Sequence, residues 1–225
     1  TVFQLILCSL AAYAFARLRF PGKNIIFITI LSVLMVPSQV IMIPSFVIMR
    51  ELGWIDTFYA IIVPGIFSAF GTFLLRQFFM AIPKELDEAA KIDGCSFFGI
   101  YWRIILPLSK PALVSLAIFT ILASWNDFLW PLIVTNSDEM RVLSIGIATF
   151  QGQYATDYPL LMAGALMATA PMIIIFLFLQ KYLLKELHLV GLKVNNLMVT
   201  SIKLAAHHLN IFFIFSKGVR LCRLN

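Results

Sequence analysis

The residues best suited to specific chemistry lie in one charged segment between two long apolar stretches. Residues 88–94 read Glu-Ala-Ala-Lys-Ile-Asp-Gly, and after nine further residues the chain continues Ile-Ile-Leu-Pro. Its small side chains, at Ala89 and Ala90, let another surface approach closely, so the segment has the composition of a docking surface. An interfacial loop that merely links two helices is the alternative. The positions that define the segment are Glu88, Ala89, Ala90, Asp93, Gly94, Ile104, Leu106 and Pro107.

Local signals predict a short helix over about residues 84–93. Pro83 suits a first turn, where its missing N–H costs nothing. Glu85, Asp87 and Glu88 follow in the first turns, where negative charge favours the positive end of the helix dipole. Gly94 can adopt the left-handed conformation that ends a helix.

A second amphipathic piece is predicted directly after this helix. Phe97, Tyr101 and Ile105 recur at every fourth position, with Phe98 and Trp102 beside them. This aromatic stripe can lie against the membrane or against a helix bundle. The proline of Ile-Ile-Leu-Pro is expected to end the piece.

The composition is that of a polytopic membrane protein. The 225 residues are 61% hydrophobic and 12% charged, with a mean hydropathy of +0.94, whereas soluble domains are roughly a quarter charged. The three cysteines, Cys8, Cys95 and Cys222, are far apart and indicate neither a disulfide framework nor a metal site. The adjacent His207 and His208 lack the spacing of metal ligands. No cofactor is predicted.

Apolar runs between charges predict about five membrane spans. A bilayer core needs about 20 helical residues, and the runs show no alternation of the kind that a barrel requires. The sequence therefore predicts an all-α transmembrane helical bundle. The predicted spans are residues 1–16, 24–49, 57–75, 111–134 and 158–180.

The distribution of basic residues predicts the orientation. Lys and Arg concentrate in the loops 17–23 and 76–110 and at the end that begins with Lys181, whereas the two alternate loops hold one each. The positive-inside rule places the basic loops and the C-terminus in the cytoplasm. The net charge of +6 thus reflects topology, and no nucleic-acid partner is implied.

Three polar residues within or beside the apolar runs are candidates for a translocation path. Asp127 is the one acid inside such a run, and intramembrane acids are functional candidates by default. Together with Asn126 it can equally mark the end of a helix. Gln39 lies between Pro37 and Pro44 and can face a solute path or belong to an ordinary kinked helix.

In the charged segment of residues 88–107 the chain resembles the permeases of bacterial ABC importers. Glu-Ala-Ala, three residues, Gly, nine residues and Ile-x-Leu-Pro is the cytoplasmic-loop signature of that family, and the spacing here matches it. The surrounding sequence is similar to that of the carbohydrate-uptake branch of the family, which is related to the maltose and glycerol-3-phosphate systems. The stretches that carry this similarity include Ala11–Lys23, Phe73–Phe79, Trp125–Pro131, Phe150–Tyr154 and Met162–Ala165.

The resemblance implies a permease in the bacterial inner membrane that imports a sugar or a sugar-like solute. It would work with two ATPase subunits, a second permease and an extracytoplasmic solute-binding protein. The loop 81–107 would hold a coupling helix that fits a cleft on an ATPase subunit. There Glu88 would pair with a basic group, Ala89 and Ala90 would pack closely, and Gly94 would set the bend.

The resemblance covers residues 1–192, the expected transmembrane permease domain. Family members usually have one more helix before the part that corresponds to Thr1. Residues 193–225 follow no family pattern and are expected to form an atypical tail.

The sequence does not predict an enzyme. The chain has no GxxxxGK[ST] segment to cradle ATP phosphates, so hydrolysis is expected from partner subunits. Two other functions stay open at this point: a secondary transporter or channel driven by an ion gradient, and an inactive membrane scaffold.

Overall fold

The computed structural model describes residues 1–150 and 158–189. The chain divides into two compact units, Thr1–Leu184 and Lys185–Asn225, and the candidate site lies within the first. The predicted tail, 193–225, and the predicted domain boundary after residue 192 lie outside the described residues.

All regular structure in the described part is helical. Its elements in chain order are α1 (Val2–Arg17), α2 (Lys23–Ser32), η1 (Val33–Met35), α3 (Ser38–Glu51), α4 (Phe58–Ile62), η2 (Val63–Gly65), α5 (Ala69–Ala81), α6 (Glu85–Ile92), α7 (Phe97–Ile100), η3 (Tyr101–Ile105), α8 (Leu106–Leu108), α9 (Lys110–Trp125), α10 (Leu129–Val134), η4 (Asp138–Met140), α11 (Leu143–Ala148) and α12 (Tyr158–Leu189).

Helices of membrane length occur near most of the predicted spans. Among the described residues, Phe58–Ala81 and Tyr158–Phe178 are each long and apolar enough to cross a bilayer. Two bent pairs qualify if each is counted as one span: Lys23–Met35 with Ser38–Glu51, and Phe97–Leu108 with Lys110–Trp125. α1 is apolar but shorter.

Residues 24–49, predicted as one span, do not form an ordinary kinked helix but two separate helices. The chain bends by 101° between η1 and α3. Pro37 has no N–H to continue a helix, and it restricts the preceding residue to extended conformations. Val36 is extended, with φ −87° and ψ 122°, and Pro37 stands at the N-cap of α3. This is a sharp turn between two helices and not an ordinary kink.

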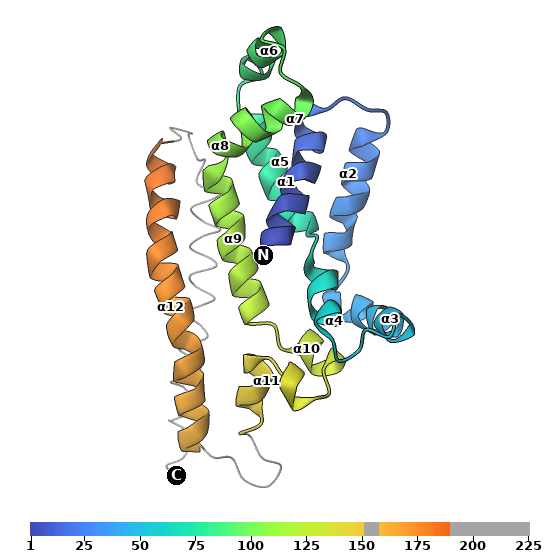
Figure 1. Cartoon of the computed structure of the whole chain (residues 1–225), viewed down its shortest axis with the longest axis vertical. Coiled ribbons are helices and arrows are strands. Elements are labelled where there is room, and N and C mark those ends of the chain that lie inside the picture. The colour runs from blue at the N-terminus through green and yellow to red at the C-terminus, as the bar shows by residue number, and fades with distance from the viewer. Residues whose placement is uncertain (151–157, 190–225) are drawn as a thin grey trace, which may run out of the picture. The chain divides into compact units, whose positions relative to one another are not determined.

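The main core joins α1, α5 and α9 to the loop that carries α6. Its fully buried side chains include Cys8 and Ala12 of α1, Leu75 and Phe79 of α5, and Leu116 of α9. Gly71 lets these helices approach closely, because a Cβ there would lie 3.0 Å from Leu116 Cδ1 and 3.2 Å from Cys8 Sγ. α1 lies alongside α5 (Figure 1).

A second, smaller core joins α3, α4 and α10, at the other end of the first unit from α6 (Figure 1). Met49, Ala60 and Val134 are buried there, and Trp54 and Trp130 pack against them. The indole N–H of Trp130 donates to the carbonyl of Ala60 at 2.9 Å. Trp54 and Trp130, which the positive-inside rule predicts to lie near the outer membrane interface, therefore pack in one cluster.

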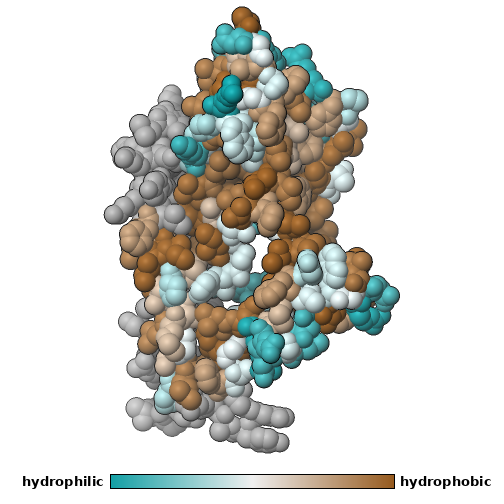
Figure 2. Space-filling model, in the orientation of Figure 1, coloured by the Kyte–Doolittle hydropathy of each residue, from teal (hydrophilic) through white to brown (hydrophobic). Residues whose placement is uncertain are grey.

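The surface has the polarity expected for a bilayer. On the face shown in Figure 2, hydrophobic residues cover the middle of the molecule, whereas hydrophilic residues gather over the end that carries α6 and over loops at the other end. Large exposed apolar side chains include Ile25, Met35, Ile43 and Leu166. Such continuous apolar surface is stable against lipid and not against water.

Candidate coupling surface

The predicted helix over 84–93 is confirmed as α6, Glu85–Ile92, and its end has the geometry that Gly94 allows. The Gly94 N–H donates to the Lys91 carbonyl at 3.0 Å, and the Cys95 N–H to the Ala90 carbonyl at 2.9 Å. These two bonds form a Schellman motif, which requires a left-handed residue, and Gly94 has φ +80°. Glu85, the first helical residue, opens an acidic first turn, as the dipole favours.

α6 has an inner and an outer face, and the two alanines lie on different ones. Ala90 is buried in the main core, and Asp87 is buried beside it. Glu88, Ala89 and the C-cap residue Asp93 are exposed. Ala90 therefore lets α6 lie close to its own bundle, and of the two alanines only Ala89 is available to a partner.

Ile92 completes the outer face, and its role there was not predicted from the sequence. Its side chain is 86% exposed at the C-terminal end of α6. A β-branched apolar residue that projects this far from a charged helix is suited to an apolar hollow in a partner.

The segment after Gly94 returns the chain to the bundle. The Ser96 hydroxyl caps α7 by accepting the N–H of Gly99 at 3.2 Å. The backbone then passes through the π-helical turn η3 into α8. Ile104 and Leu106 are half-buried against the main core, and Pro107 is exposed.

The prediction that Pro107 ends this piece was wrong by two residues. Pro107 stands in α8, and the helix that runs from α7 through η3 continues past it to Leu108. The break falls instead at Ser109, with φ −101° and ψ 12°, and the axis turns by 75° into α9.

The predicted aromatic stripe divides between two environments. Tyr101 and Ile105 are buried in the main core, whereas Phe97, Phe98 and Trp102 are exposed. The Phe98 and Trp102 rings stack with centroids 6.5 Å apart and an interplanar angle of 16°. One side of this segment therefore packs in the main core, while its other side exposes the rings of Phe98 and Trp102.

A buried ion pair beside α6 was missed by sequence reasoning. Arg17 Nε of α1 lies 3.4 Å from Asp87 Oδ2, with side chains 4% and 11% exposed. The sequence indicates Arg17 only as part of the basic loop 17–23, and Asp87 only as a charge that favours the start of a helix. A usable signal exists, because Arg17 stands four residues after Tyr13 and eight after Ser9 on one face of α1.

The three translocation candidates have different hydrogen-bond partners in the described structure. Gln39 is exposed on α3, and its Oε1 accepts a weak hydrogen bond from the adjacent Ser38 hydroxyl at 3.4 Å. α9 ends at Trp125, so the predicted span 111–134 is not one helix. Asn126 caps that end by donating to the Leu122 carbonyl at 2.8 Å. Asp127 is exposed in the turn that follows, and its carbonyl accepts the Ser144 hydroxyl at 2.8 Å. Both residues fit the structural alternative.

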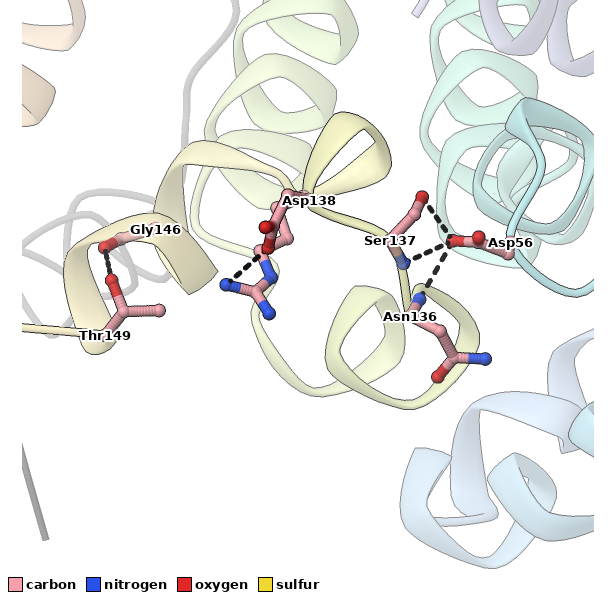
Figure 3. A network of polar contacts seen from close by, with 7 residues as sticks. Asp56, Asn136, Ser137, Asp138, Gly146 and Thr149 are labelled. Atoms are coloured by element: carbon pink, nitrogen blue, oxygen red, sulfur yellow. Dashed lines mark hydrogen bonds and ion pairs between the residues drawn. The ribbon is translucent and has the colours of Figure 1, made fainter.

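A second polar site lies at the end with the smaller core (Figure 3). Asp56 Oδ1 accepts the backbone N–H groups of Asn136 at 2.9 Å and Ser137 at 3.0 Å, and the Ser137 hydroxyl at 3.1 Å. The Asp56 N–H donates to the Val134 carbonyl at 2.8 Å. The backbone hydrogen bonds from Ser137 and Asn136 lower the pKa of Asp56. These contacts form a clasp between the loop after α3 and the loop after α10.

Comparison with known proteins identifies the class. The model of the family described as binding-protein-dependent transport system inner membrane component matches residues 4–188. A bacterial ABC transporter involved in the import of the acidic polysaccharide alginate has a crystal structure that superposes with a TM-score of 0.73. That likeness has 26% identity and covers 81% of this chain and 69% of that one.

Curated relatives extend the match. The arabinooligosaccharides transport system permease protein AraQ is 41% identical in Halalkalibacterium halodurans over 192 residues, which cover 85% of this chain and 69% of the relative. AraQ of Bacillus subtilis is 42% identical over 193 residues, covering 86% and 69%. The sn-glycerol-3-phosphate transport system permease protein UgpE of Yersinia pestis is 34% identical over 189 residues, covering 83% and 67%.

The fold and these matches define an inner-membrane permease of the ABC-importer class. This chain belongs to the family of binding-protein-dependent transport system inner membrane components. It is a non-catalytic transmembrane subunit of an ABC transporter complex. The predicted family, the all-α fold and the non-enzymatic role are confirmed, and the ion-driven alternative is wrong.

Proposed function

We propose that α6 is the coupling helix of this permease and docks on an ABC ATPase subunit. The observation that carries the proposal is the outer face of α6, where Glu88, Ala89, Asp93 and Ile92 are exposed on a helix whose inner face is fixed to the bundle. A partner can therefore push on this helix without first unfolding it from the chain.

Within that contact Glu88 is proposed to pair with a basic group of the ATPase cleft. Among the described residues no hydrogen bond or ion pair holds the Glu88 carboxylate, so the charge is free for a partner. Ala89 lets the cleft wall approach, and Gly94 fixes where the chain leaves the cleft. Ile104 and Leu106 support α6 from the inner side, because they pack the returning segment against the bundle, and the exposed Pro107 follows them in that segment.

The complete complex is proposed to hold two ATPase subunits, a second permease subunit and an extracytoplasmic solute-binding protein. The loops 17–23 and 76–110 and the C-terminus lie in the cytoplasm, since they hold the excess of Lys and Arg. Residues 1–192 form the permease domain, and 193–225 a tail outside it.

The proposed solute is an oligosaccharide. The relatives with the highest identity given above transport arabinooligosaccharides by name, at 41% and 42% identity. The chain's own candidates for contact with solute are Gln39, Asn126 and Asp127, all of which are exposed and can hydrogen-bond to hydroxyl groups.

The test is binding-protein-stimulated ATP hydrolysis in proteoliposomes that contain the permease with its partner subunits. Glu88→Lys is expected to lower the stimulation by at least tenfold, because it places two like charges in the contact, which costs more than about 1.4 kcal/mol. Glu85→Lys is the matched control, with the same charge change in the first turn of the same helix. It is expected to retain most of the stimulation.

Unchanged stimulation with Glu88→Lys, or equal losses in both variants, would contradict a position-specific contact. The same assay tests the solute class when arabino-oligosaccharide, glycerol-3-phosphate and alginate oligosaccharide are supplied in turn. Stimulation by glycerol-3-phosphate alone would contradict the proposed oligosaccharide.

A further inference from the structure

One face of α1 carries the polar side chains that hold the loop around α6. Ser9, Tyr13 and Arg17 stand at every fourth position, so they project from one side of the helix. The Ser9 and Tyr101 hydroxyl oxygens lie 2.7 Å apart, and the Tyr13 hydroxyl donates to the Phe97 carbonyl at 2.9 Å. Arg17, at the end of this face, makes the contacts that reach α6 itself.

Arg17 joins three helices at one point. Its Nη2 donates to the carbonyl of Ile82, directly after α5, at 2.7 Å, while its Nε lies 3.4 Å from Asp87 Oδ2 on α6. A guanidinium is rigid and planar, so the hydrogen bond from Nη2 to Ile82 orients the charge that faces Asp87. The side chain therefore sets the position of α6 relative to both α1 and α5.

The two charges depend on each other. Both side chains are buried, and Arg17 Nε, Arg17 Nη1 and Asp87 Oδ1 have no hydrogen-bond partner among the described residues, so the two charges are held together as an ion pair. A buried charge that loses its partner stays uncompensated, which is costly. The nearby core contacts, at Ala90 of α6 and at Cys95 after it, are apolar and lack direction.

Neighbouring acids on α6 thus face opposite ways. Asp87 is buried toward Arg17, whereas Glu88 is exposed on the outer face. Successive helical residues point about 100° apart, so the Asp87 carboxylate can face the bundle while the Glu88 carboxylate faces a partner.

We propose that the Arg17–Asp87 pair is the positioning contact that makes α6 and α1 move as one body, so that a displacement of α6 reaches the packed helices α1, α5 and α9. The proposal rests on the proposed function, in which an ATPase subunit holds the outer face of α6. Arg17 and Asp87 act through α6 and are positioning residues.

The test must separate positioning from folding. A contact that only stabilises the fold changes how much complex assembles, and it scales basal and stimulated ATP hydrolysis equally. A contact that transmits movement changes their ratio. The readout is therefore the ratio of binding-protein-stimulated to basal hydrolysis, measured in proteoliposomes on equal amounts of assembled complex.

The deciding variant is the double substitution Arg17→Met with Asp87→Leu. It removes both buried charges together and keeps similar volume, so assembly is expected to survive. The ratio is expected to fall at least threefold. If this variant does not assemble, Arg17→Lys decides in the same way, because it keeps the charge but loses the rigid planar group. Arg50→Lys is the matched control, since the Arg50–Glu51 pair is 62% and 69% exposed, and its ratio is expected to be unchanged.

A wild-type ratio in the deciding variant would overturn the proposal. Glu88→Lys in the same preparation keeps the two hypotheses apart. If Glu88→Lys abolishes stimulation while the deciding variant is normal, α6 docks but the ion pair does not transmit. If Glu88→Lys has no effect, the docking itself is wrong.

Discussion

Asp56 has a backbone conformation that residues with side chains rarely adopt. Its φ is +61°, and among the described non-glycine residues it alone has a positive φ. Asp and Asn tolerate this region better than other residues, because their short polar side chains can bond locally. Here the same carboxylate accepts three hydrogen bonds from residues 136 and 137, so the unusual backbone is coupled to the contact between two loops.

The clasp is expected to depend on pH through Asp56. Its folded pKa is lowered, so the carboxylate contributes stability above its unfolded pKa of about 4, and that contribution is lost as pH falls through the folded value. Asp56→Asn keeps an acceptor but no charge. The variant should therefore have a lower thermal midpoint than the wild type at about pH 6, and the difference should shrink as the pH falls below about 4 and vanish only below the lowered folded pKa.

Thermal unfolding of the purified protein in detergent, followed across that pH range, checks this expectation. Asp138→Asn is the control, because Asp138 is 85% exposed in its pair with Arg141 and exposed pairs contribute little. A difference for Asp56→Asn that is constant with pH would show that charge plays no part in the clasp.

The helices α1, α5 and α9 pack closely around a single glycine, Gly71, which sets the distance between them. A Cβ at Gly71 would lie 3.0 and 3.2 Å from the two Leu116 methyl carbons and 3.2 Å from Cys8 Sγ. Leu116 is buried and has little room to move. The separation of these helices is therefore set by the absence of a side chain.

Gly71→Ala is expected to destabilise the permease. Overpacking costs about 1–3 kcal/mol, which offsets or exceeds the gain of about 1 kcal/mol from replacing glycine in a helix. Gly146→Ala in α11 is the matched control, since nothing lies within 4 Å of a Cβ there, and it should be neutral or stabilising. Equilibrium unfolding in mixed detergent measures both variants.

Relief at Leu116 distinguishes overpacking from other causes. Adding Leu116→Val to Gly71→Ala should recover part of the lost stability, because it removes the nearest methyl carbon. Gly71→Ala that is as stable as Gly146→Ala would contradict the account of the close contact.

Across the molecule, the end that carries α6 and the end that carries the Trp54–Trp130 cluster are predicted to face opposite sides of the membrane. The bent pair Phe97–Leu108 and Lys110–Trp125 lies between them in the chain. The outward position of the tryptophans and the inward position of α6 both follow from the distribution of basic residues.

Single cysteines test this topology. With Cys8, Cys95 and Cys222 replaced, Asp93→Cys should react with a membrane-impermeant maleimide only in inside-out vesicles, and Glu139→Cys only in right-side-out vesicles. Both positions are exposed, so access through the protein does not limit labelling. Labelling of both from one side would show that the bent pair does not cross the bilayer as one span.

Much of this architecture follows from short-range rules that operate within one stretch of chain. The helix over 84–93 and its end at Gly94 were predicted because capping, helix dipole and left-handed glycine depend on a few neighbouring residues. Membrane spans were located for a similar reason, since hydropathy sums over about 20 adjacent residues. The motif of the charged segment led to the family because its spacing is contained in the sequence.

Contacts between distant residues required the packed structure. The sequence offered no means to see that Pro37 turns the chain by 101° or that Ala90 faces the bundle while Ala89 faces outward. The pairing of Arg17 with Asp87, and of Asp56 with Ser137, joins residues far apart in the chain. Such pairings depend on how helices pack against one another, because burial and direction arise only when separate elements come together.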